Sequence, residues 1–259
     1  MPPNIVFVLL DTARASNFSS YGYNRRTTPF IDSLAADGIR YRRAFANSIF
    51  SLPSYSSIFT GEYPSSHRAV DWGCRITDNR LIRGLNERGY TTQAVSTHLI
   101  SGEFGIADAF DEVKSRFSSE ELLFDDELIN DLMTKANREG WETNKEMYFD
   151  VLKRLLRSPN PKHMLNGGHL LYERFKDSRG MWSDDGAENV LRGARETVRS
   201  TSEPFFLFLN FVETHAPYKP PKEYIRTFMP DDVSFEEIRD AIRYSSYLAC
   251  LDREKISDR

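Results

Sequence analysis

The chain has 259 residues and a formal net charge of -4. It has no basic surplus, which argues against nucleic acids and acidic membrane surfaces as partners. No apolar run approaches the roughly 18 residues of a membrane span, and the N-terminal residues lack the charged start of a signal peptide, so we expect a cytoplasmic protein without a membrane span. Cys74 and Cys250 lie far apart in no metal-like spacing and predict neither a disulfide framework nor a zinc site.

The first predicted element is a strand over residues 5–10, an unbroken run of apolar side chains. Such a run is typical of a parallel strand that is covered on both faces. Asp11 follows it directly, and in open α/β sheets ligands bind at the carboxyl ends of strands. Asp11 is therefore a candidate metal or substrate ligand, with a turn or helix-capping aspartate as the alternative. Thr12 and Arg14 continue the polar loop.

A short helix is predicted from Ser51 onward, because Pro53 suits its first turn and Gly61 its end. The helix N-terminus presents Ser51 where unpaired backbone N–H groups and the helix dipole attract an anion. The serine hydroxyl could there bind or attack a phosphate or sulfate ester. A serine that only caps the helix is the alternative.

Helices and strands alternate over much of the remaining chain, as in α/β proteins. The pattern predicts helices over 28–37, 79–88 and 184–200 and strands over 39–45, 90–95 and 205–212. His98 and His215 follow the last two of these strands, as Asp11 follows the first. Both histidines are thus placed like Asp11, after a strand. For His98, a structural or solvated side chain is the alternative.

Several segments then match one family in order. Residues 3–11 and 27–35 resemble the opening of sulfatases, in the alkaline phosphatase superfamily. Residues 51–67, which include Ser-Leu-Pro-Ser and Thr-Gly-Glu-Tyr-Pro-Ser-Ser-His, look like the family's nucleophile signature. Matches at 89–92, 110–112 and 204–218 follow in the same order, and the resemblance covers nearly the whole chain.

The resemblance implies an α/β fold with a mostly parallel sheet flanked by helices on both faces, alkaline-phosphatase-like. We expect one catalytic domain over 1–259, with a helical insertion at about 118–183 and without the C-terminal strands of the family. The implied activity is metal-dependent hydrolysis of a sulfuric or phosphoric ester, with a small molecule or a glycan as the organic part.

The resemblance also implies roles for single residues. Ser51 takes the nucleophile position, directly or as the precursor of formylglycine, and His215 contacts the ester. Asp11 and Thr12 are candidate ligands of a divalent cation, for which Ca²⁺ is the first candidate and Mg²⁺, Mn²⁺ and Zn²⁺ are alternatives.

Arg14 and His98 are candidate substrate-binding residues. The chain also departs from the family's pattern. Tyr55 stands where many sulfatases carry arginine, and Thr12 follows Asp11 where many carry a second aspartate. The later aspartate that completes the family's metal site, with its histidine or asparagine, has no counterpart in the sequence. Two alternatives to a hydrolase therefore stay open: a degenerate, non-catalytic member of the family, and a fragment of a longer enzyme.

Overall fold

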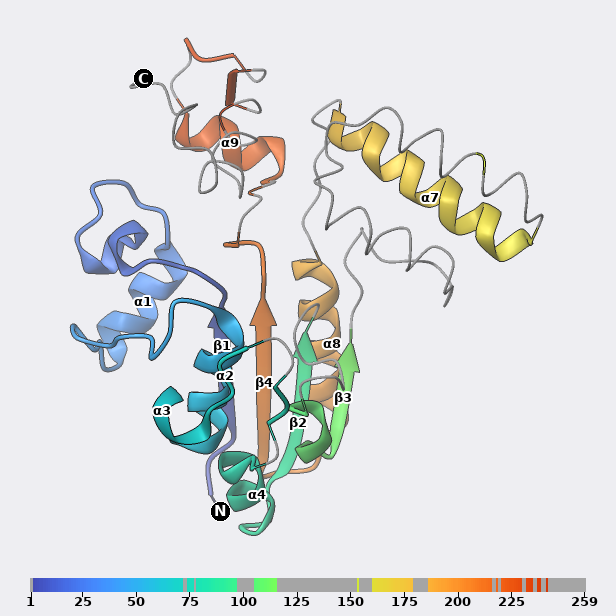
Figure 1. The fold of residues 1–259 in the computed structure, drawn as a ribbon. Coiled ribbons are helices and arrows are strands. Elements are labelled where there is room, and N and C mark those ends of the chain that lie inside the picture. The colour runs from blue at the N-terminus through green and yellow to red at the C-terminus, as the bar shows by residue number, and fades with distance from the viewer. Residues whose placement is uncertain are drawn as a thin grey trace. The chain divides into compact units, whose positions relative to one another are not determined.

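A computed structural model shows the fold (Figure 1). The chain divides into two compact units. The first, here called the sheet unit, comprises Met1–Arg116, Asp184–Tyr218 and Tyr244–Arg259, and the second comprises Phe117–Ser183 and Lys219–Arg243. The structure describes residues 2–71, 74–76, 78–96, 105–115, 153, 160–178, 186–215, 218, 220–229, 232–234, 237–238 and 241.

The second unit contributes two described helices, α7 (Pro161–Ser178) and α9 (Lys222–Phe228). The insertion predicted at about 118–183 lies mostly outside the described residues. Within the part of the chain that the structure describes, no helix is both long and apolar enough to cross a bilayer.

Four parallel strands form the sheet, in the order β1-β4-β2-β3. The strand that comes last in the sequence therefore lies between the first two, as Figure 1 shows. This crossover brings the carboxyl ends of β1 and β4 to the same edge of the sheet. The strands are β1 (Ile5–Leu10), β2 (Thr91–Ser96), β3 (Glu112–Ser115) and β4 (Phe205–Phe211).

The helices of the sheet unit form close to where the sequence predicts them, except for α3, which was not predicted. Gly61 ends α2 in the left-handed conformation, with φ 74°, and its N–H donates to the Ser57 carbonyl, which agrees with the predicted glycine stop. The helices are α1 (Pro29–Asp37), α2 (Ser51–Thr60), α3 (Pro64–His67), α4 (Arg80–Asn86) and α8 (Ala187–Ser200).

The strand predicted over 39–45 is wrong, because this segment forms neither a strand nor a helix. Its apolar residues remain exposed, with Ile39 at 82 % and Phe45 at 84 %. A strand needs a neighbour to satisfy its backbone groups, and none of the described strands lies beside this segment.

Alternation along β4 divides the core of the sheet unit into two clusters. Phe206 and Phe208 pack on one face, against side chains of α2 and α4. Leu207 and Leu209 pack on the other face, against Val190 of α8. Helices therefore cover both faces of β4, as the predicted fold class requires.

Phe208 is the centre of the first cluster. It has no exposed surface, and its ring lies 5.5 Å from that of Phe7, 6.3 Å from that of Tyr55 and 5.3 Å from that of Phe59, measured between centroids. Aromatic pairs at such distances stabilise a core beyond the area that they bury.

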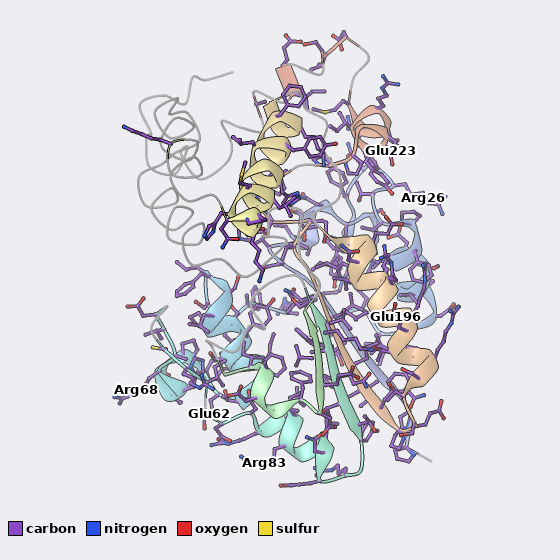
Figure 2. All side chains as sticks on the ribbon, turned by 90° about the vertical axis from the view of Figure 1, so that its right-hand side faces the viewer. Arg26, Glu62, Arg68, Arg83, Glu196 and Glu223 are labelled. Carbon is purple, nitrogen blue, oxygen red and sulfur yellow. The ribbon has the colours of Figure 1, made fainter. Side chains whose placement is uncertain are left out.

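Charged side chains contribute less to the stability of the fold. Glu62 and Arg83, labelled in Figure 2, take part in surface ion pairs. Glu62 pairs with Arg80 at 2.8 Å, and Arg83 pairs with Asp78 at 2.9 Å. Exposed pairs of this kind contribute about 0–1 kcal/mol each.

We predict that Phe208→Ala lowers the free energy of unfolding by about 3–5 kcal/mol, because it leaves a cavity among several rings. Urea denaturation measures the change. Phe30→Ala is the matched control, since Phe30 is 73 % exposed, and should change the value by about 0.5 kcal/mol or less. Equal effects of the two substitutions would show that Phe208 is not a core residue.

Candidate active site

The loops that follow β1 and β4 are joined by hydrogen bonds. The Asp11 N–H donates to the Phe211 carbonyl at 2.8 Å, which extends the strand pairing by one residue. The Thr12 hydroxyl donates to the Thr214 carbonyl, and the Thr214 hydroxyl donates to the Asp11 carbonyl, both at 2.6 Å. These bonds fix the backbone at the carboxyl ends of both strands.

Thr12 has a φ of 57°, in the left-handed region that β-branched residues rarely adopt. Such a conformation costs on the order of 1–3 kcal/mol and persists only where its surroundings impose it. The bonds that Thr12 and Asp11 make with Thr214 impose it here. The role of Thr12 as a metal ligand remains a prediction.

Ser51 and Asp11 come together at this edge. The Ser51 hydroxyl donates to the Asp11 carboxylate, with Oγ at 3.3 Å from Oδ2 and 3.4 Å from Oδ1. Asp11 is 7 % exposed. The N-cap of α2 is Phe50, and Ser51 is the first helical residue. The alternative of Ser51 as the N-cap therefore does not hold.

Tyr55 lies one helical turn after Ser51 and is 2 % exposed. Its ring packs against Phe59 and Phe208, and its buried hydroxyl has no hydrogen-bond partner among the described residues. Burial raises the pKa of the Tyr55 phenol far above its usual value, and the negative charge of Asp11 raises this pKa further. The residue at the family's arginine position is thus an uncharged core residue.

The structure shows less about the three other predicted site residues, which are His215, Arg14 and His98. His215 lies in the turn after β4, where its backbone N–H donates to the Val212 carbonyl at 2.8 Å and its side chain is exposed. Arg14 is exposed and precedes the 3₁₀ turn Ala15–Asn17. His98 lies outside the described residues. The roles of these three residues stay predictions.

His67, in the segment that matches the nucleophile signature, joins α2 to α3. Its Nδ1 accepts a hydrogen bond from the Ala69 N–H at 3.0 Å, and its Nε2 lies 3.1 Å from the Ser57 hydroxyl. In a neutral ring, Nε2 would therefore carry the proton and donate it to Ser57. Both ring nitrogens of His67 therefore take part in local hydrogen bonds.

A divalent cation is implied by the family resemblance. The described residues contain no group of three or more His, Cys, Asp or Glu side chains that could hold one. Asp11 and Ser51 offer oxygen ligands side by side, whereas Ca²⁺ takes about six to eight and Mg²⁺ about six. Asp11 thus suits one ligand position, and the described residues do not complete the site.

The model of the sulfatase family matches residues 3–253. The chain belongs to the sulfatase family. This membership confirms the resemblance seen in the sequence.

Two curated sulfatases illustrate the similarity. An N-acetylgalactosamine-6-O-sulfatase of Bacteroides thetaiotaomicron is 25 % identical over 259 aligned residues, which cover 84 % of this chain and 49 % of the relative. An arylsulfatase of Clostridium perfringens is 24 % identical, over 90 % of this chain and 47 % of the relative. The chain therefore spans about half the length of these two sulfatases.

A solved structure confirms the predicted fold class. The phosphonate monoester hydrolase of Agrobacterium radiobacter superposes with a TM-score of 0.56 and 18 % identity, over 90 % of this chain and 45 % of that one. The chain described here thus has the expected fold, a mostly parallel sheet with helices on both faces.

We predict that Tyr55→Phe raises the free energy of unfolding by about 1–3 kcal/mol, because it keeps the ring and removes a buried hydroxyl that has no hydrogen-bond partner in the described part of the chain. Urea denaturation of the two proteins measures the change. Tyr63→Phe should have no effect, since Tyr63 is 69 % exposed. A loss of stability in Tyr55→Phe would show that the hydroxyl is hydrogen-bonded in solution.

Proposed function

We propose that the chain contributes the nucleophile side of a sulfatase-like hydrolase of sulfuric or phosphoric esters, with Ser51 at the nucleophile position. The observation that carries this proposal is the Ser51 hydroxyl at 3.3 Å from the buried Asp11 carboxylate. Family membership supports the reaction type, and the N-terminus of α2 supports an anionic substrate, because its first N–H groups have no partner within the helix.

The chain's own residues suit an attack on sulfur or phosphorus. As the Ser51 oxygen forms a bond to that atom, its proton moves toward the Asp11 carboxylate. The bond from the same atom to the ester oxygen breaks, and the leaving oxygen needs a proton, for which His215 is the candidate donor. Water then releases the anion from Ser51. If Ser51 is converted to formylglycine, a hydroxyl of the hydrated aldehyde takes the place of the serine hydroxyl.

The helix alone does not supply enough stabilisation for this step. A helix N-terminus contributes about 0.3–2 kcal/mol to a nearby anion. A bound divalent cation can lower the pKa of a coordinated water from about 15.7 to about 7, which corresponds to roughly 12 kcal/mol. Asp11 is the described residue best placed to be one ligand of such a cation.

We propose a sulfated glycan or a small sulfate ester as the substrate class. The relative matched over 84 % of this chain carries the name N-acetylgalactosamine-6-O-sulfatase. A phosphate ester is the second candidate, because a helix N-terminus binds either anion.

Ser51→Ala should abolish turnover of 4-nitrophenyl sulfate or 4-nitrophenyl phosphate measured with Ca²⁺, Mg²⁺, Mn²⁺ or Zn²⁺, with a loss of about 10³-fold or more in kcat. Ser66→Ala is the control, since Ser66 is exposed on α3, and should keep full activity. The mass of the peptide that contains Ser51 distinguishes serine from formylglycine.

One result would contradict the proposal, and a second would favour an alternative to an active chain. Equal turnover by the parent chain and Ser51→Ala would remove Ser51 from the reaction. No turnover with any of the four ions would favour the degenerate, non-catalytic alternative or a chain that needs a further polypeptide.

A further inference from the structure

The Tyr55 hydroxyl is a buried hydrogen-bond donor that the proposed reaction does not use. The Tyr55 side chain lies in the core beneath the site, and its hydroxyl has no hydrogen-bond partner among the described residues. Buried polar groups of folded proteins are nearly always hydrogen-bonded, and one without a partner destabilises the fold. The hydroxyl therefore points to a partner that it meets in another state of the site.

The Asp11 carboxylate is a buried acceptor with a single, long hydrogen bond. In the described part of the chain, the Ser51 hydroxyl is its only donor, and Oγ lies at 3.3 Å from one carboxylate oxygen and 3.4 Å from the other. A hydroxyl that donates to a carboxylate usually approaches to about 2.5–2.7 Å. Because Asp11 is 7 % exposed, bulk water supplies little further hydrogen bonding, and the carboxylate can accept from a second donor.

Tyr55 and Ser51 lie on the same side of α2. They are four residues apart, about one helical turn, and helical side chains lean toward the helix N-terminus. The Tyr55 side chain therefore extends toward Ser51 and Asp11. Burial is the main cause of the raised pKa of Tyr55, and the negative charge of Asp11 is the second cause, which agrees with this direction. A donor without a partner thus lies near an acceptor that has one weak donor.

The proposed reaction removes that one donor from Asp11. The Ser51 oxygen bonds to the sulfur or phosphorus of the ester, its proton moves to the Asp11 carboxylate, and the bond to the leaving oxygen breaks. The Ser51 ester that forms has no O–H group to donate. One oxygen of the Asp11 carboxyl group is then a buried acceptor without a donor, which is unfavourable. A second donor near Asp11 would stabilise this step.

We propose that Tyr55 is a positioning residue whose hydroxyl donates to the Asp11 carboxyl group whenever Ser51 has no hydroxyl to donate. This inference rests on the proposed function for its place in the reaction. The change of donor itself depends only on the loss of the Ser51 hydroxyl. It also accounts for the buried Tyr55 hydroxyl, which has no partner in the described part of the chain while Ser51 donates to Asp11.

A double-mutant cycle followed by urea denaturation tests the change of donor without turnover. In the parent chain, Tyr55→Phe should raise the midpoint of unfolding by about 0.3–1 M, because the unpartnered hydroxyl is removed. In the Ser51→Ala background, the same substitution should lower the midpoint by about as much, because Asp11 then loses its remaining donor. Ser51→Gly provides a second background where Ser51→Ala does not fold. Tyr63→Phe, at an exposed position, should shift the midpoint in neither background.

Steady-state kinetics test the place of this bond in the reaction. With 4-nitrophenyl sulfate or 4-nitrophenyl phosphate, Tyr55→Phe should lower kcat by about tenfold or more and leave KM within about twofold, because the bond forms only as Ser51 reacts. A merely structural role of the hydroxyl would not combine a slower reaction with a more stable protein.

Shifts of the midpoint in the same direction in both backgrounds would overturn the inference, whether or not the parent chain is active. An unchanged kcat in an active Tyr55→Phe variant would also overturn it. Absence of turnover by the parent chain would count against the proposed function alone. The direction of the shift in the Ser51→Ala background would then decide the inference about Tyr55 by itself.

Discussion

The pairing of β1 with β4 is the constraint on which the candidate site depends. It joins residues about 200 positions apart in the sequence and continues past the strand ends through the bond from the Asp11 N–H to the Phe211 carbonyl. The bond from the Thr12 hydroxyl to the Thr214 carbonyl and the bond from the Thr214 hydroxyl to the Asp11 carbonyl then hold Thr12 in its left-handed conformation. Asp11 is thereby fixed where the first turn of α2 presents Ser51.

Local sequence was sufficient to predict the elements that build this arrangement. The apolar runs 5–10 and 205–211 have the length and composition of buried parallel strands, and Gly61 ends α2 as a left-handed cap. The resemblance to sulfatases assigned Asp11 and Ser51 to one site, as metal ligand and nucleophile, and ligands bind at the strand ends of an α/β sheet.

Other features depend on contacts that the sequence does not show. β3 was not predicted because Glu-Val-Lys-Ser holds a single apolar residue and is a strand only through its pairing with β2. Residues 39–45 have apolar side chains suited to a strand, but none of the described strands lies beside them. The core position of Tyr55 follows from its packing on Phe208, which no local pattern indicates.

The electrostatics of the site limit what Asp11 and Ser51 can do alone. Where many sulfatases carry arginine, this chain has a buried, neutral phenol, and Asp11 adds a negative charge nearby. The proposed divalent cation would add positive charge there, and it needs more oxygen ligands than Asp11 and Ser51 provide.

Acid quenching during turnover, followed by peptide mass spectrometry, tests the central claim about Ser51 most directly. The account predicts a sulfate or phosphate ester on the Ser51 side chain, or on formylglycine at that position, that forms and decays with turnover. Turnover without an adduct at position 51, or with an adduct on another residue, would contradict it.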